Sequence, residues 1–368
     1  MLYDIVIVGA GVAGCATALA LKKANKTLRI AIIERNESVV HPYKIGETLP
    51  PHASKQFQNL NIWKPFLACD FSSSYGTSSL WGSNKVYTNE YIFSPYGYGW
   101  NLDRNQFDQF MMEQTKLQEV DFYFNTSCVT SVLDNSQWQL ECESNSDRLN
   151  LKAIFVVDAS GKKAAFAALQ GIQKVRSDNQ VGIYRFYDIN QHHETKIKEG
   201  IVVETTQNGW WYSATLPNNK LVLGYMTDAD LAHDLKLKSP INFEALLQQT
   251  QITGERTLAL ETKTSPFLVA AHTQYLSASV GEGWLAVGDA ASSYDPISSL
   301  GIYKSLVMSQ WASFAIIDAL NEEKSGLKKY DYLVQQDFQQ YTAKRLEFYQ
   351  QEKRFSEAVF WKRRHYNQ

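Results

Sequence analysis

Three glycines and one acidic residue near the start of the chain have the spacing of a dinucleotide-binding turn. Gly9, Gly11 and Gly14 follow the apolar residues 5–8, and Glu34 comes 20 residues after Gly14. In such a turn the first glycine permits the tight bend, the second lets a pyrophosphate approach the backbone, and the third lets helix and strand pack closely. A carboxylate placed like Glu34 accepts hydrogen bonds from a ribose. The segment therefore predicts a dinucleotide site.

Three further segments have residue types that suit the same site. Residues 283–291 read as an apolar strand that ends in Gly288 and Asp289, where a carboxylate can accept hydroxyl donors beside the positive end of the next helix. Residues 157–161 end another apolar strand with Asp-Ala-Ser-Gly. Arg104 stands where an amphipathic helix is expected to begin, so its alternative is an ordinary surface charge at a helix start.

These segments, taken together and in order, resemble the p-hydroxybenzoate hydroxylase superfamily of FAD-dependent monooxygenases. The resemblance covers nearly the whole chain and implies FAD as the cofactor. The residues that it implies at the cofactor are Gly9, Gly11, Val12, Ala13, Gly14, Glu34, Arg35, Glu47, Arg104, Val129, Asp158, Ser160, Gly161, Gly288, Asp289, Pro296, Gly301 and Ile302.

Five short motifs narrow the resemblance. They lie at residues 46–51, 96–100, 209–213, 295–301 and 360–364. The combination looks like flavoproteins related to tryptophan halogenases, and most like the LodB/GoxB group, which assists tryptophylquinone biogenesis in partner quinoprotein oxidases. This implies a quinoprotein oxidase precursor as the partner, and oxygenation of a tryptophan within it as the reaction. Electrons would come from transiently bound NAD(P)H or from a separate flavin reductase.

The chain departs from the halogenases at the lysine that relays their activated halide. That lysine lies a few residues ahead of a tryptophan, but no lysine occurs between Pro65 and Trp81. The turn that holds chloride in halogenases reads Ser299-Leu300-Gly301 here. We therefore keep halogenation, or oxygenation of a small or carrier-bound aromatic, as the alternative function. A flavin-binding maturation chaperone that performs no oxygenation is a second alternative.

The resemblance and the residue types suggest candidates for the chemistry. Glu47 and Asp295 are possible acid/base or positioning groups, although Glu47 could only cap a loop and Asp295 could only fix a turn. Pro296, Ser299 and Gly301 would shape the wall near the flavin. The aromatic residues weighed as pocket lining, against ordinary core packing, are Trp81, Tyr98, Trp100, Trp210 and Trp211.

Hydrophobic periodicity supplies the elements that would hold these residues. It predicts a βαβ unit over residues 4–34, an antiparallel sheet over 181–226 and a long apolar helix over 301–320. The expected fold is α/β: a Rossmann-like FAD-binding domain, an inserted antiparallel substrate domain and a C-terminal helical tail. The expected boundaries are 1–75, 101–180 and 272–326 for the FAD-binding domain, 76–100 and 181–271 for the substrate domain, and 327–368 for the tail.

Composition excludes several other classes of protein. The 368 residues carry a net charge of −2 with 44% hydrophobic and 20% charged residues, so neither disorder nor a nucleic-acid partner is expected. No run approaches the roughly 20 apolar residues of a membrane span. The four cysteines are scattered and the histidines lack metal spacing, which favours reduced thiols, a cytoplasmic location and no metal site.

The end of the chain has two interpretations. Residues 362–364 are basic and are expected at a solvated helix end. Phe360, Trp361, Arg363 and Arg364 are also of the types that anchor protein interfaces, so they are candidates for contact with a partner polypeptide. Packing of the tail against its own FAD-binding domain is the competing interpretation.

Overall fold

A mostly parallel sheet forms the base of the molecule in the computed structural model, which describes residues 2–41, 44–45, 48–144, 147–189, 200–258, 260–262, 264–323 and 325–365. Its order is β19-β20-β11-β1-β2-β8, with the β9–β10 hairpin paired to the start of β11. The strands are β1 (Leu2–Val8), β2 (Ile30–Ile33), β8 (Asp121–Tyr123), β9 (Thr126–Asp134), β10 (Gln137–Ser144), β11 (Asp147–Asp158), β19 (Val280–Gly281) and β20 (Trp284–Ala286). Their apolar residues are buried on both faces, as in other parallel sheets.

Two helices pack closely over this sheet because the residues between them are small. The predicted first helix is α1 (Val12–Ala24), and the predicted long helix is α9 (Gly301–Leu320). Ser309 Oγ donates to the carbonyl of Ala13 at 3.1 Å, and it lies 3.1 Å from Thr17 Oγ1. The neighbouring helices are α2 (Ala53–Asn59), α3 (Trp63–Leu67), α4 (Arg104–Lys116) and α5 (Ala165–Leu169).

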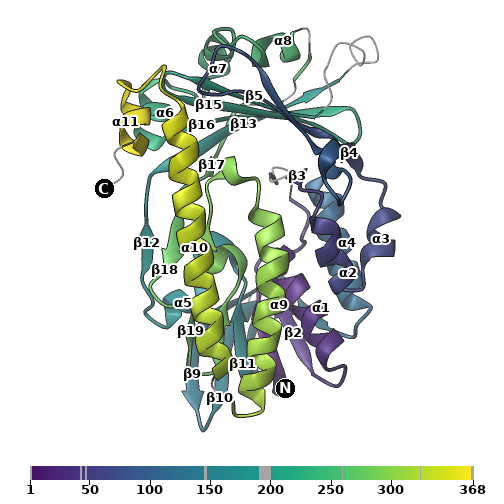
Figure 1. The fold of residues 1–368 in the computed structure, drawn as a ribbon. Helices are drawn as coiled ribbons and strands as arrows, with labels where there is room; N and C mark the ends of the chain where they lie inside the picture. Colours follow the sequence, from purple (N-terminus) through teal and green to yellow (C-terminus); the bar gives the residue numbers. More distant parts are fainter. Residues whose placement is uncertain are drawn as a thin grey trace.

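A second sheet lies above the first (Figure 1), in the order β17-β13-β16-β15-β14-β5-β6. Its strands are β5 (Gly76–Leu80), β6 (Tyr87–Glu90), β13 (Gln180–Asp188), β14 (Ile201–Thr206), β15 (Gly209–Leu216), β16 (Lys220–Asp228) and β17 (Phe267–Ala270). The predicted sheet was purely antiparallel, but β5 pairs with β14 in parallel. This happens because β5 enters the sheet from a distant part of the chain rather than through a hairpin.

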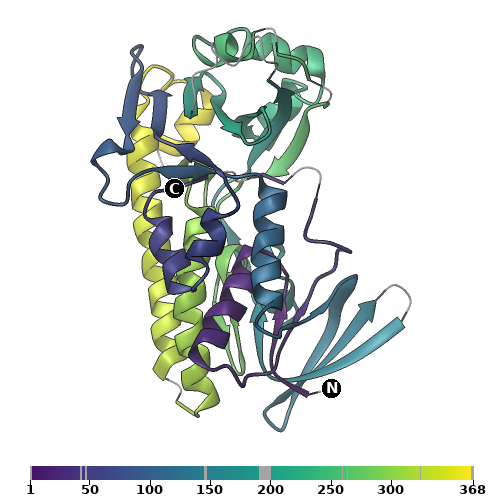
Figure 2. The same cartoon turned by 90° about the vertical axis from the view of Figure 1, so that its right-hand side faces the viewer.

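Short helices cover the outer face of the second sheet (Figure 2). They are α6 (Ala229–Asp234), α7 (Pro240–Leu247) and α8 (Thr253–Thr257). The smaller sheets are β3 (Thr48–Leu49) with β7 (Gly99–Asn101) and β4 (Ser72–Ser74), and β12 (Lys174–Arg176) with β18 (Gln274–Leu276) and β21 (Ser292–Ser293). The α/β fold class is confirmed, and we propose that the two main sheets mark two domains with the predicted boundaries.

One helix spans the length of the molecule and joins the two main sheets (Figure 1). This is α10 (Ser325–Gln351), whose 27 residues extend about 40 Å. Near its start Tyr330 donates to the carbonyl of Ala286 in β20 at 2.7 Å, and near its end Tyr349 contacts Trp210 in the second sheet. No helix in the described part of the chain is long and apolar enough to cross a membrane.

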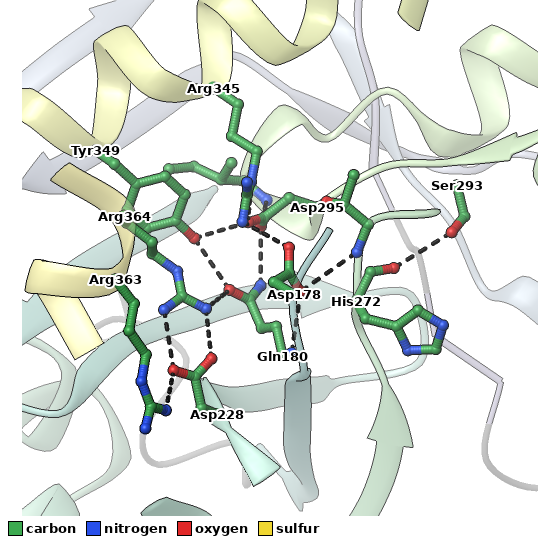
Figure 3. A network of polar contacts seen from close by, with 12 residues as sticks. Asp178, Gln180, Asp228, His272, Ser293, Asp295, Arg345, Tyr349, Arg363 and Arg364 are labelled. Atoms are coloured by element: carbon green, nitrogen blue, oxygen red, sulfur yellow. Dashed lines mark hydrogen bonds and ion pairs between the residues drawn. The ribbon is translucent and has the colours of Figure 1, made fainter. Parts of the chain in front are cut away.

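The end of the chain packs inside the molecule, so the prediction of a solvated basic end was wrong for Arg364. The last helix is α11 (Val359–His365), in which Phe360 and Trp361 are fully buried. The Arg364 side chain donates to Asp228 at 2.7 Å and to Gln180 at 2.8 Å (Figure 3). Arg363 also pairs with Asp228, at 2.8 Å. The last helix therefore packs inside the molecule, but against the second sheet and not against the FAD-binding domain that the competing interpretation named.

The same network continues from Gln180 to the turn that begins at Asp295 (Figure 3). Gln180 donates to Asp295 at 3.0 Å, and Tyr349 donates to the other carboxylate oxygen at 2.7 Å. Arg345 of α10 lies 3.0 Å from Asp295 and 2.7 Å from Asp178. Three segments far apart in sequence are thereby fixed to one another: the turn, the second sheet and the tail.

We predict that Arg364→Met lowers the free energy of unfolding by about 3–5 kcal/mol, because Asp228 would be left buried and incompletely paired. The matched control is the neighbouring Lys362→Met. Lys362 forms a solvent-exposed ion pair with Glu357, and such a pair contributes about 0–1 kcal/mol to stability. Urea unfolding followed by circular dichroism measures both. Equal unfolding midpoints for the two variants would contradict the role of Arg364.

Candidate functional site

A cavity of about 630 Å³ lies between the parallel sheet and the second sheet. Its lining combines the start of α1, the end of β11, the turn before α9 and the inner face of the second sheet. The predicted residues that line it are Gly11, Val12, Ala13, Arg35, Arg104, Gly161, Asp289, Asp295, Pro296, Ser299, Gly301 and Ile302. These residues come from six separate parts of the sequence, which the fold brings to one place.

The glycine-rich turn places open backbone against this cavity. A Cβ built on Gly11 would meet no atom within 4 Å, whereas one on Gly14 would lie 2.0 Å from the carbonyl of Gly9. Gly14 therefore closes the turn, and Gly11 faces space. No side chain caps the first turn of α1, and no acidic residue lies in it. Its free N–H groups and the positive end of the helix suit a phosphate.

Glu34 stands at the end of β2 as predicted, but its carboxylate already has partners. One oxygen accepts from the backbone N–H of Ala10 at 3.0 Å, and the other accepts from the Asn36 backbone and side chain at 3.0 and 2.8 Å. Glu34 itself does not line the cavity among the described residues. Since each carboxylate oxygen has two lone pairs, a ribose contact remains a prediction.

Cationic side chains gather at the end of the cavity nearest the glycine turn. Arg35 is exposed, whereas Lys44 and Arg104 both pair with the buried Asp108. Arg104 is 3.3 Å from the Asp108 carboxylate and also donates to the carbonyl of Ile45. Arg104 therefore lines the cavity instead of extending from the surface. The contribution of Lys44 was missed, since nothing local in the sequence marks it.

Asp289 enters the cavity from the short helix η3 (Gly288–Ala290). Its carboxylate pairs with Lys304 of α9 at 3.1 Å, and its side chain is 37% exposed, so one oxygen remains accessible to a ligand. Lys304 also donates to the carbonyl of Ser292. Gly288 brings η3 close to α1, because a Cβ there would lie 2.7 Å from that of Ala13.

Asp158 acts behind the cavity wall. It is fully buried, and it accepts from the Ser160 backbone and hydroxyl at 3.0 and 2.6 Å and from the Ala167 backbone at 2.8 Å. Burial raises the pKa of its carboxyl, and these hydrogen bonds oppose that shift. Asp158 and Ser160 thus hold the loop whose neighbours Ala159 and Gly161 line the cavity. Direct contact of Asp158 with the cofactor remains a prediction.

Asp295 lines the cavity, but its carboxylate belongs to the network with Arg345 and Tyr349. It also accepts from the Ile297 backbone at 3.0 Å and so begins the helix η4 (Pro296–Ser298). Burial alone would raise the pKa of Asp295, but Arg345 and the hydrogen bonds hold it below its ordinary value. A carboxylate stabilised in this way favours the turn-fixing interpretation over proton transfer.

The turn from Asp295 prepares a second helix start at the cavity. Ser299 adopts a left-handed conformation with φ of 50°, and α9 begins two residues later at Gly301. A Cβ on Gly301 would meet no atom within 4 Å. The N-termini of α1 and α9 therefore both face the cavity, and each can stabilise negative charge on a ligand.

The structure does not support the pocket-lining interpretation of the five aromatic residues. None of the five weighed residues lines the cavity: Trp81, Tyr98, Trp100, Trp210 and Trp211. Trp81 packs against Trp210 and Trp361, and Trp211 packs against Phe243 on the opposite face of the sheet. The second sheet instead contributes Tyr184, Tyr212, Met226 and Val269. Since alternate residues of a strand share a face, Tyr212 was distinguishable from Trp211 by its position.

Several predicted cofactor residues do not line the cavity themselves: Gly9, Gly14, Glu34, Val129, Asp158, Ser160 and Gly288. Glu47 lies outside the described residues. Val129 is on β9, is partly exposed and does not line the cavity. Lys162, directly after Gly161, was not singled out in the sequence but does line it. Among the residues that the structure describes, no group of three His, Cys, Asp or Glu side chains is arranged to hold a metal ion.

Comparison with known proteins gives relatives for this architecture. A family model described as lycopene cyclase protein matches residues 4–196, which is just over half of the chain. The FAD-dependent oxidoreductase LodB of Marinomonas mediterranea is 27% identical over 99% of this chain and 97% of its own length.

Two solved structures share the fold. The myxobacterial chondrochloren halogenase CndH, an FAD-dependent halogenase, has a TM-score of 0.88 at 19% identity, covering 99% of this chain and 86% of its own. QhpG is a peptidyl tryptophan dihydroxylase essential for tryptophylquinone cofactor biogenesis. It has a TM-score of 0.71 at 19% identity, covering 99% of this chain and 79% of its own. The chain therefore belongs to the family described as lycopene cyclase protein, within the superfamily of FAD-dependent halogenases and oxidoreductases.

Proposed function

We propose that this protein is an FAD-dependent monooxygenase that oxygenates a tryptophan side chain in a quinoprotein precursor during tryptophylquinone biogenesis. The observation that carries the proposal is the set of residues that lines the cavity. It begins at the glycine turn of α1 and ends at an apolar, tyrosine-containing wall formed by the second sheet. A cofactor held at one end would thus meet an aromatic ring at the other.

The residues present fit FAD. The open backbone at Gly11 and the uncapped start of α1 suit the pyrophosphate, with Arg35 and Arg104 nearby. Asp289 presents an accessible carboxylate oxygen for sugar-alcohol hydroxyls. We assign the cofactor to these residues and retain the other predicted contacts, Glu34 included, as part of the same proposal.

Bound FAD, once reduced, supplies the two electrons that activate dioxygen. The reaction balances as follows: an aromatic C–H, O₂, two electrons and two protons give a phenolic C–OH and one water. The electrons come from NAD(P)H, directly or through a separate reductase. The protein contributes position and exclusion of water. Tyr184, Tyr212 and Met226 form the wall against which an indole ring would pack.

A polypeptide substrate is supported by one structural neighbour and by one surface. QhpG, which shares the fold, is a peptidyl tryptophan dihydroxylase. On this chain the last strand of the second sheet, β6, is fully exposed and leads into η1 (Tyr91–Phe93). Tyr87, Ile92 and Phe93 are 69%, 77% and 92% exposed. An open strand edge with apolar side chains suits an extended polypeptide.

The buried tail changes where the partner is expected to bind. Phe360 and Trp361 are inaccessible, and Arg363 is engaged with Asp228 and Asp230. We therefore move the proposed partner contact from the tail to β6 and η1. The four cysteines are free thiols, which is consistent with our proposal of a cytoplasmic location.

The alternative enzymatic function is halogenation or oxygenation of a small or carrier-bound aromatic, in line with the shared fold of CndH. The second alternative is a flavin-binding chaperone. Consumption of oxygen separates them: a chaperone would bind the precursor without using O₂, and a small-molecule enzyme would use O₂ without the precursor.

The cofactor assignment predicts that Gly11→Val lowers FAD content at least tenfold without unfolding the protein. Gly11 has φ of −72° and ψ of −175°, which valine adopts readily, and the new side chain would occupy the cavity. Flavin absorbance per mole of protein measures the effect, and the melting temperature checks the fold. Gly14→Ala is the contrast, because it should reduce both. Unchanged flavin content in Gly11→Val would refute the assignment.

The surface assignment predicts that the double variant Ile92→Ser/Phe93→Ser retains FAD but matures a co-expressed quinoprotein precursor at least fivefold more slowly. Phe314→Ser is the matched control, since Phe314 is 69% exposed on α9, away from β6. Quinone absorbance of the partner is the readout. Equal maturation by the double variant and the control would exclude β6 and η1 as the contact.

Co-expression tests the function itself. The precursor should stay immature when this gene is deleted, and Gly11→Val should fail to restore it. Maturation in the deletion strain would contradict the proposal. Restoration by a flavin-free Gly11→Val protein would favour the chaperone.

A further inference from the structure

Lys162 lines the cavity, and none of the described acidic side chains forms an ion pair with its ammonium group. Its ammonium donates to the carbonyl oxygens of Ala270 and His272, both at 3.1 Å. In the described part of the chain, no ion pair within 4.0 Å includes it. By contrast, Lys304 pairs with Asp289. Two neutral carbonyls offset only part of the cost of removing an ammonium from water.

The position of Lys162 places this charge at the reactive end of the cavity. It lies in η2 (Gly161–Lys163), directly after the parallel sheet, and it reaches Ala270 at the end of β17 in the second sheet. Its ammonium thus bridges the two layers at the wall where the substrate ring is expected. Arg35, Lys44 and Arg104, which suit the pyrophosphate, come from other elements.

Burial lowers the pKa of Lys162, and Lys304 adds to that shift. The carboxylates of Asp289, Asp295 and Asp178 offset part of it through space. Lys162 and Asp289 are neighbours because η2, which carries Lys162, packs against η3, which carries Asp289. An anion arriving next to Lys162 would therefore be stabilised by a cation that pairs with no acidic side chain of the described residues at contact distance.

We propose that Lys162 is an anion-binding residue of the reaction centre, which neutralises a small or delocalised negative charge at the junction of the two sheets. This rests on the proposed function for the presence of FAD in the cavity. Two sources supply such a charge: the isoalloxazine ring gains it on reduction, and a substrate carboxylate or a halide carries it permanently. Both require the same cation at the same place.

The test uses the FAD-loaded protein and variants that separate charge from hydrogen bonding. Lys162→Gln retains donors for the two carbonyls but removes the charge, and Lys162→Arg retains the charge. Lys163→Gln is the matched control, because Lys163 is the exposed neighbour in the same turn. Two quantities are measured for each protein: the midpoint potential of the flavin, and the dissociation constants of benzoate and bromide from changes in flavin absorption.

We expect Lys162→Gln to weaken binding of one anion about tenfold, with Lys162→Arg and Lys163→Gln close to wild type. If the reduced ring is the anion, the flavin potential falls by the equivalent of tenfold, about 30 mV for a two-electron couple. If a substrate anion is bound, the potential is unchanged and the dissociation constant of benzoate or bromide rises tenfold.

An unchanged potential together with unchanged benzoate and bromide affinities in Lys162→Gln would overturn the assignment and leave Lys162 as a tie between η2 and β17. That result would not affect the proposed function. Conversely, Lys162→Gln could change the flavin potential or an anion affinity while the wild-type protein modifies no precursor. That result would support anion binding by Lys162 and reject the proposed substrate. If the wild-type protein bound no FAD, both the proposed function and the role of Lys162 would be rejected.

Discussion

The cavity depends on a fixed separation between the two main sheets, and the buried network at Asp295 maintains that separation. Asp295 begins the turn that leads to α9, while its carboxylate is bound by Gln180 of the second sheet and by Arg345 and Tyr349 of α10. The free-energy cost of removing these charges from water offsets much of the attraction between them, so such a network adds little net stability. We infer that its main effect is geometric: it holds the turn, the sheet and the helix in one arrangement.

This arrangement gives the cavity two different ends. At one end, the glycine turn, the start of α1 and nearby cations favour phosphate groups. At the other, Tyr184, Tyr212 and Met226 favour an apolar ring, and Lys162 provides one positive charge beside it. A flavin that spans the cavity would place its ring where the two layers meet. Oxygenation needs this combination, since the reactive end must exclude water while still stabilising charge.

Local patterns predicted much of the fold, because the chemistry of the glycine turn is encoded in adjacent residues. Gly9 and Gly14 are close in sequence and close in space, and Glu34 follows at the end of the next strand. Strand alternation also explains why Tyr212 faces the cavity while Trp211 does not.

The remainder depended on contacts between distant segments. Asp295 appeared as a possible acid or base because Gln180, Arg345 and Tyr349 lie 50 or more residues away and showed no sign of converging on it. The tail residues Phe360 and Trp361 had the composition of an interface, yet they pack against the second sheet of the same chain. Composition alone cannot distinguish an internal interface from an external one, because both bury aromatic rings.

We propose that the protein transfers an oxygen atom from O₂ to a tryptophan of a partner precursor. Incubation of the FAD-loaded protein, NADH with a flavin reductase, and the precursor under ¹⁸O₂, followed by peptide mass spectrometry, measures this directly. We expect ¹⁸O in the tryptophan-containing peptide with the wild-type protein and none with Gly11→Val. Oxygen derived from water, or a precursor that matures without any labelled tryptophan, would contradict it.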